Sequence, residues 1–194
     1  MDARHSYAAA SRRELTKAQN REAILAAARL VFAELGFAAA TVRDIIRATS
    51  LASGTFYNYF KSKEEVYQAL RDELALAVRP RLRQARLSAA SAEEFFAGTF
   101  RALFQFVMEN ETAPERFRMD SPEVLAGFAE LRQDVEAAMA RGLLPATDAA
   151  LLCAALIGVA FELAEQVKAG AGVEDMARFA TALFLGGIGA LPKS

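Results

Sequence analysis

Apolar residues recur along this chain at the three- and four-residue spacing of amphipathic helices, and no alternating Val/Ile/Thr-rich run indicates a strand. The first pattern covers residues 16–35, and Gly36 follows at the position where helices commonly end. A capping box at residues 62–65 opens another helix to about Val78, before Pro80 breaks or kinks it. Further helices are predicted over residues 91–109, 121–141, 147–168 and 173–190. We therefore predict an all-α fold of about nine helices.

Two short helical patterns lie unusually close together within residues 41–63, which read TVRDIIRATSLASGTFYNYFKSK. Thr41 with Asp44 three residues later is a helix-start signature, and residues 50–52 form the turn. The second helix runs from Ser53 to about Phe60. A gap of about three residues between helices permits only a tight helix-turn-helix.

The second helix of this motif exposes hydroxyl, amide and small groups with no acid among them: Gly54, Thr55, Tyr57, Asn58 and Tyr59. A helix that lies on phosphates and reads base edges needs this chemistry. A surface helix without a partner more often intersperses Glu and Lys. Two tightly joined helices can also be plain structure in a bundle, but the aromatic and hydroxyl pattern favours double-stranded DNA as a partner.

Two apolar runs, residues 149–161 and 179–191, are thirteen residues long, short of the roughly 20 that cross a bilayer. We therefore predict buried helices and no membrane span. Each run is apolar nearly all round, which implies burial on two sides. The core supplies one side, and a symmetric second copy is the simplest source of the other. The predicted homodimer interface comprises Leu152, Leu156, Val159, Leu183, Phe184 and Ile188.

The formal net charge of −1 conceals an asymmetry between the two parts of the chain. Residues 1–63 carry ten Lys/Arg against five Asp/Glu, a net of +5, and the remainder carries thirteen against nineteen, a net of −6. This pattern indicates a basic, anion-binding head and an acidic, solvated body. We place the boundary between residues 1–65 and 66–194, along the fourth helix and without a Gly/Ser linker.

Aromatic residues crowd the predicted helix 91–109, where Phe96, Phe100 and Phe104 form one i, i+4, i+8 stripe. Two interpretations stay open: ordinary core, or an apolar pocket for an apolar or amphipathic small molecule. The candidate pocket residues are Phe96, Phe100, Phe104, Met108, Phe117, Phe128 and Phe161.

Four arginines, at positions 79, 81, 83 and 86, form a basic cluster beyond Val78. We interpret this cluster as a solvated face in preference to a contact with nucleic acid or an acidic ligand.

The sequence contains little that points to catalysis. The chain has one His, His5, and one Cys, Cys153, so neither a metal site nor a nucleophile arrangement can be built around them. We therefore predict no catalytic residues, no metal and no cofactor, and not an enzyme. The start of the chain has no apolar leader, and a single Cys fits a reducing compartment, so we expect the cytoplasm.

Several motifs occur in order in the first 65 residues. They are Arg21-x-x-Ile24-x-x-Ala27-Ala28, Phe32-x-x-x-Gly36-Phe37, Thr41-Val42-Arg43-Asp44-Ile45, Ser53-Gly54-Thr55-Phe56-Tyr57-Asn58-Tyr59-Phe60 and Ser62-Lys63-Glu64. This stretch resembles the DNA-binding domain of the TetR (tetracycline-repressor-like) family of bacterial transcriptional regulators. The remaining two thirds match that family only in helix count and in the apolar last pair of helices. Ser50, Ala52 and Ile46 depart from the pattern, which leaves the start of the recognition helix open.

The resemblance implies phosphate contacts from one group of residues and base contacts from another. Phosphate would be bound by Thr41, Tyr57, Tyr59 and Lys63, and bases would be reached by Arg43, Ser53, Gly54 and Thr55, with Asn58 able to do either. Phe56 and Phe60 would be core. It further implies a homodimeric, ligand-responsive regulator that releases a palindromic operator. The alternatives are a constitutive DNA-binding dimer without a pocket and, less favoured, a helical enzyme or carrier.

Overall fold

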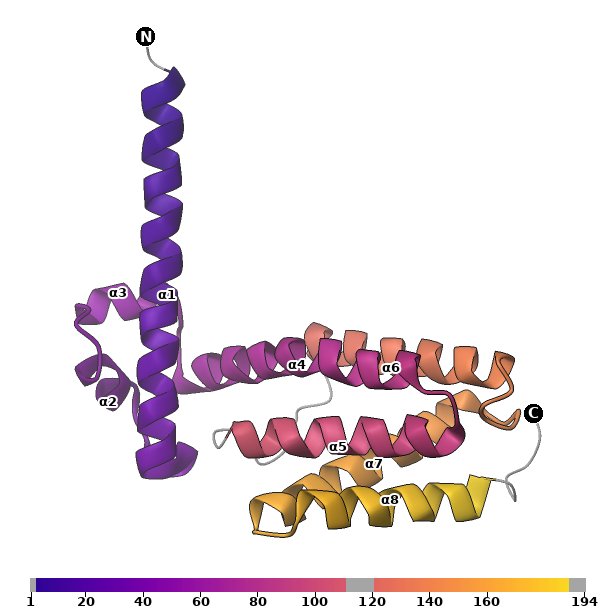
Figure 1. The fold of residues 1–194 in the computed structure, drawn as a ribbon. Coiled ribbons are helices and arrows are strands. Elements are labelled where there is room, and N and C mark those ends of the chain that lie inside the picture. The colour runs from indigo at the N-terminus through magenta and orange to yellow at the C-terminus, as the bar shows by residue number, and fades with distance from the viewer. Residues whose placement is uncertain (1–2, 111–120, 189–194) are drawn as a thin grey trace. The chain divides into compact units, whose positions relative to one another are not determined.

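The computed structural model describes residues 3–110 and 121–188, with side chains from Glu14 onward, and these residues form helices and connecting turns without a strand (Figure 1). The all-α prediction is confirmed, with eight helices in the described ranges. They are α1 (Ala3–Ala39), α2 (Val42–Arg47), α3 (Ser53–Tyr57), α4 (Lys63–Ser88), α5 (Ala92–Glu109), α6 (Pro122–Ala140), α7 (Ala149–Lys168) and α8 (Val173–Ile188).

The chain divides into two compact units, Met1–Arg71 and Asp72–Ser194. Helix α4 runs through the boundary between them, and our boundary at residue 65 stays a prediction. The helix also continues through Pro80, so the expectation that it ends near Val78 is wrong. Proline removes one helical hydrogen bond, but residues on either side of it bond to α6: Arg79 to Glu130 and Arg86 to Asp134.

The first unit is built around the apolar face of α1, whose Ile24, Leu25 and Ala28 are fully buried. They pack in one cluster with residues of the short helices, among them Ile45 and Phe56. Helix α1 begins at Ala3, well before the predicted start near residue 16. Gly36 interrupts it with φ 73°, a left-handed conformation that favours glycine, so the predicted stop is a break inside α1.

The second unit has a core of stacked phenylalanines contributed mainly by α5. Phe96, Phe100 and Phe104 are at most 1% exposed, and Phe184 of α8 lies against two of them. Its ring centroid is 5.3 Å from that of Phe96 and 5.7 Å from that of Phe100. Burying a side chain of this size contributes about 1.5–3 kcal/mol, so this stack is a main source of cohesion between α5 and α8.

Side-chain caps fix the starts of three helices in this unit, α5, α6 and α7. Ser91 accepts a hydrogen bond from Glu94 N, and Ser121 accepts one from Val124 N ahead of Pro122, as the sequence predicts. Helix α7 is capped by Asp148, one residue after the predicted Thr147.

Helix α7 is longer than the apolar run that predicts it, with 20 residues and a mean hydropathy of 1.8. By length and composition alone it could cross a membrane, so run length by itself does not exclude a span. Leu152, Leu156 and Val167 on α7 are instead buried in the core of the second unit.

Candidate functional site

Helix α2 begins with the capping box that its sequence predicts. The Thr41 hydroxyl accepts from Asp44 N at 3.3 Å and donates to the Asp44 carboxylate at 2.6 Å. The Asp44 carboxylate also accepts from Thr41 N at 3.0 Å. These bonds to Thr41 lower the pKa of Asp44 below its ordinary value. The first residue of the motif is thereby fixed in position.

The turn that follows α2 is held by Thr49, whose hydroxyl donates to Ile46 O at 2.8 Å and accepts from Leu51 N at 3.2 Å. No non-glycine residue in the described ranges has a positive φ, so Ser50 occupies the turn without backbone strain. Helix α3 then begins at Ser53 after Ala52, which makes no side-chain cap bond. Ala52 is the N-cap position, so the departure from the family pattern there leaves α3 without a side-chain cap.

Helix α3 ends at Tyr57, earlier than predicted, although Phe60 N still donates to Phe56 O at 3.0 Å. Phe56 and Phe60 are buried, as predicted. Six of the nine candidate DNA-binding residues are exposed: Thr41, Arg43, Ser53, Gly54, Tyr57 and Asn58. A Cβ at Gly54 would meet no atom within 4 Å, so the backbone there is open to close approach.

The second unit contains an apolar cavity of about 130 Å³ between α4, α5, α6 and α7. Three of the candidate pocket residues, Phe100, Phe128 and Phe161, line it. Phe96 and Phe104 are fully buried in the core and do not line it, and Met108 is 54% exposed. Phe117 lies outside the described residues.

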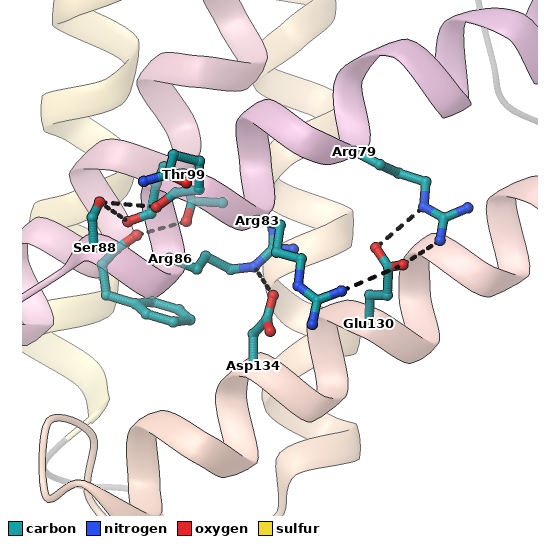
Figure 2. A network of polar contacts seen from close by, with 10 residues as sticks. Arg79, Arg83, Arg86, Ser88, Thr99, Glu130 and Asp134 are labelled. Atoms are coloured by element: carbon teal, nitrogen blue, oxygen red, sulfur yellow. Dashed lines mark hydrogen bonds and ion pairs between the residues drawn. The ribbon is translucent and has the colours of Figure 1, made fainter.

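Two guanidinium–carboxylate pairs join α4 to α6 beside this cavity (Figure 2). Arg79 donates through two nitrogens to Glu130, whose carboxylate also lies 3.9 Å from Arg83. Arg86 donates to Asp134 at 2.8 Å, with only 4% and 6% of the two side chains exposed. The prediction that this arginine cluster is a solvated face is wrong for Arg79 and Arg86, because their partners lie on α6. The hydrogen bond from Arg79 lowers the pKa of Glu130, and Arg83 and Arg86 add to the effect.

Comparison with known proteins identifies the first unit. Residues 24–70 match the family model described as bacterial regulatory proteins, tetR family. This match covers 47 of the 194 residues, and over it the first unit is similar to the TetR family. The predicted resemblance is confirmed.

A curated relative is the HTH-type transcriptional repressor KstR2 of Mycolicibacterium smegmatis, 38% identical over 91 residues. That match covers 46% of this chain and 44% of the relative, so the chain spans less than half the length of this curated relative. Among solved structures, FadR from Bacillus subtilis, in complex with stearoyl-CoA, is 22% identical with a TM-score of 0.72, over 86% of this chain and 98% of that one. RolR, in complex with resorcinol, is 23% identical with a TM-score of 0.64, over 91% and 90%. At these identities the two structures establish a shared fold.

Two of the TetR-type candidate DNA contacts have partners within the first unit. The Lys63 ammonium donates to the carbonyls of Phe37, Ala38 and Ala40 at 2.8–3.2 Å. It also lies 4.6 Å from the centroid of the Phe37 ring. The Tyr59 hydroxyl accepts from Asn20 Nδ2 at 3.3 Å. Both side chains therefore hold α1 against the rest of the unit, a role that their sequence positions did not indicate.

Lys63→Met is expected to lower the free energy of unfolding by about 1.5–3 kcal/mol, the range for hydrogen bonds to a charged donor. Methionine retains much of the apolar stem but leaves the three carbonyls, two at the end of α1 and one directly after it, without their donor. Urea unfolding monitored by circular dichroism measures the change. Lys61→Met, at an exposed neighbouring position, is the matched control. An equal loss of unfolding free energy in both variants would contradict the proposed role of Lys63 in holding α1.

The predicted dimer residues lie mostly on the inner face of the last two helices. Leu152, Leu156, Phe184 and Ile188 are 3–8% exposed and belong to the core of the same protomer. Val159 is half-buried, and only Leu183, 51% exposed, is available to a partner. The apolar outer face comprises Leu151, Phe179, Leu183 and Leu185, interspersed with exposed Ala and Gly residues. The helix face was therefore assigned wrongly for the four buried residues.

Proposed function

We propose that this chain is a ligand-responsive transcriptional repressor of the TetR type that binds a palindromic operator as a homodimer and releases it when a small effector binds. One observation carries the proposal. Helix α4 begins in the unit that holds the helix-turn-helix, and its later residues Val78, Arg79 and Leu82 line the apolar cavity. A ligand that displaces the part of the cavity wall formed by α4 therefore acts on the helix that directly follows the helix-turn-helix.

DNA binding in this proposal rests on groups of α2, α3 and their cap residues, of which Thr55 is half-buried and the others are exposed. Arg43, Ser53, Gly54 and Thr55 would reach base edges, while Thr41 and Tyr57 would hold phosphates. Asn58 can do either. Two such units in a symmetric dimer would enter successive major grooves, with centres about 34 Å apart or somewhat more.

The homodimer would form through the outer apolar face of α7 and α8. Leu151, Phe179 and Leu183 are 71%, 57% and 51% exposed, which is unusual for large apolar side chains gathered on two neighbouring helices. A Cβ placed on Gly158, Gly186 or Gly187 would meet no atom within 4 Å, so a partner helix can approach closely there.

Effector control would act through α4. The coupling between two sites is typically about 1–3 kcal/mol, enough to weaken operator binding about 5- to 150-fold. Stearoyl-CoA bound to FadR and resorcinol bound to RolR support a ligand in a chain of this fold. The cavity counts against the alternative of a constitutive DNA-binding dimer with a solid core.

A regulator of this type has no need of catalytic groups, and no His/Cys/Asp/Glu cluster suited to a metal occurs among the described residues. We propose that the protein is not an enzyme. Its relatives are named as transcriptional regulators, and these names support the proposed location in the cytoplasm.

The test is selection of bound duplexes from a random DNA pool with the purified full-length chain at a stated salt concentration. Enrichment of a palindrome is expected, and the enriched sequence supplies an operator for affinity measurements. Salt-sensitive binding without an enriched sequence would contradict the proposed sequence-specific binding of DNA.

Tyr57→Phe is expected to weaken binding to that operator by about 10-fold or more, because a hydrogen bond to a charged phosphate is worth roughly 1.5–3 kcal/mol. The ring retains its edge-on packing against Phe56, whose centroid is 5.4 Å away. Fluorescence anisotropy measures the change. Tyr59→Phe is the matched control, since its hydroxyl is bonded to Asn20 inside the unit. Unchanged affinity for Tyr57→Phe would contradict the phosphate role.

A further inference from the structure

We propose that the cavity of the second unit takes a small aromatic carboxylate, whose carboxylate replaces that of Glu130 on the Arg79 guanidinium. The proposal that this ligand binds is based on the cavity and its ion pairs. Its effect on operator binding rests on the proposed function.

The size of the cavity sets the body of the ligand. An apolar cavity of about 150 Å³ in another protein stays dry and binds benzene. At about 130 Å³ the present cavity matches a single six-membered ring. A long acyl chain is too large for this space and would extend beyond it.

The lining of the cavity favours an unsubstituted ring surface. Aliphatic side chains from several helices, such as Leu82, Leu103 and Ile157, make up half of the lining residues. The rings of Phe100 and Phe128 supply aromatic contacts. A ring enclosed there loses its hydration without needing hydrogen-bond partners.

The charges at the wall select an anionic head group. Arg79 and Arg83 both lie within 4 Å of one carboxylate, that of Glu130, so two cations share one anion. Arg86 is held separately by Asp134. Glu123 also lines the cavity and opposes an anion, but the pKa of Glu130 is still lowered by three arginines together. A carboxylate bound at this position is therefore favoured over a neutral or cationic head.

Glu130 is the exchangeable member of the network, and Asp134 is not. The Glu130 side chain is 22% exposed and can turn its carboxylate into water when a ligand takes its place. The Asp134 side chain is 6% exposed and has no such path. Because guanidinium remains charged at any working pH, Arg79 is left with a forked donor that fits a carboxylate on two N–H groups.

Exchange at Glu130 would remove the bond between Arg79 on α4 and Glu130 on α6 while the Arg86–Asp134 bond stays in place. The pair between Arg83 and Glu130 would be lost with it, so α4 would then be held to α6 by the Arg86–Asp134 pair and by the ligand. In the proposed repressor this change is expected to weaken operator binding within the 5- to 150-fold range typical of coupled sites.

Isothermal titration calorimetry of the full-length chain tests the binding claim without DNA. The probes are benzoate, benzyl alcohol as its neutral counterpart, benzylamine as its cationic counterpart and stearate. Benzoate is expected to bind about 10-fold or more tightly than benzyl alcohol, given the strength of charged hydrogen bonds. Equal affinities for benzoate and benzyl alcohol, or tightest binding of benzylamine or stearate, would overturn the proposal.

Three variants sharpen the experiment. Arg79→Gln should remove the preference for benzoate while benzyl alcohol, which reports an intact cavity, binds within about 2-fold of the unmodified chain. Glu130→Gln should tighten benzoate binding, because it removes the competing carboxylate. Arg81→Gln is the matched control, since Arg81 pairs with Glu109 and does not line the cavity. Weaker benzoate binding in Glu130→Gln, or a retained preference in Arg79→Gln, would refute the exchange.

Operator binding measured with and without benzoate separates the two proposals. If benzoate binds with the expected variant pattern but operator affinity is unchanged, the ligand class holds and the proposed effector response fails. If benzoate does not bind while another small molecule releases the operator, the ligand class fails and the proposed function holds.

Discussion

Asp134→Ala is expected to lower the free energy of unfolding of the chain by about 3–5 kcal/mol, among the largest effects of any single substitution. The substitution removes the carboxylate that lies 2.8 Å from Arg86 Nε, at a site where both side chains are almost completely buried. A buried guanidinium without its carboxylate retains its desolvation cost and loses its compensation. Urea unfolding followed by circular dichroism measures the loss.

The paired variant Arg86→Met with Asp134→Leu distinguishes this cause from simple loss of volume. Removing both charges together should restore stability to near that of the unmodified chain, because buried ion pairs are often replaceable by apolar groups. Glu136→Ala on the same helix is the control, since its pair with Arg132 is exposed and such pairs contribute about 0–1 kcal/mol. If Asp134→Ala lowers the free energy of unfolding as little as Glu136→Ala does, then Arg86 is not left as an unpaired buried charge in the Asp134→Ala variant.

The type and order of the helices could be predicted from sequence because each signal is local. Thr41 with Asp44, Ser91 with Glu94, and Ser121 before Pro122 each cap a helix through bonds to residues three positions away or fewer. Helix ends were harder to predict at helix-breaking residues that lie inside a longer helix. Pro80 is a helix breaker by propensity, yet α4 continues through it because packing outweighs one lost bond, whereas Gly36 does break the helical conformation inside α1.

The face that a helix turns inward was harder to predict where the helix is apolar all round. Leu151 and Leu152 are adjacent and chemically identical, but one is 71% exposed and the other 3%. Which of the two leucines is buried depends on where α5 and α6 lie against α7, and residues near Leu151 and Leu152 in the sequence do not specify this position. The same holds for the aromatic stripe, since Phe96 stacks on Phe184 and is closed off while Phe100 still reaches the cavity.

The ion pairs of the cavity wall left a detectable signal in the sequence. Arg79, Arg83 and Arg86 are spaced i, i+4, i+7, which places them on one helix face, and Glu130 and Asp134 are spaced i, i+4 on another. Matching stripes of opposite charge on two helices indicate a pairing. The chain offers other acidic stripes, so the sequence does not say which helix is the partner.

Leu183→Glu is expected to convert the proposed homodimer to a monomer, the largest change in assembly that one substitution should cause. By two-fold symmetry the substitution places two carboxylates in one apolar interface. A central interface residue is worth about 2 kcal/mol or more, so two copies correspond to roughly a 1,000-fold weaker dimer. Sedimentation velocity across a concentration series measures the change, with Leu125→Glu on α6 as a control of equal exposure, 50% against 51%. If Leu125→Glu dissociates the dimer and Leu183→Glu does not, the interface does not lie on α8.

A monomeric Leu183→Glu variant should also keep its affinity for a half-site and lose binding to the full palindrome. The reason is that α2 and α3, which hold the proposed DNA contacts, belong to the other unit.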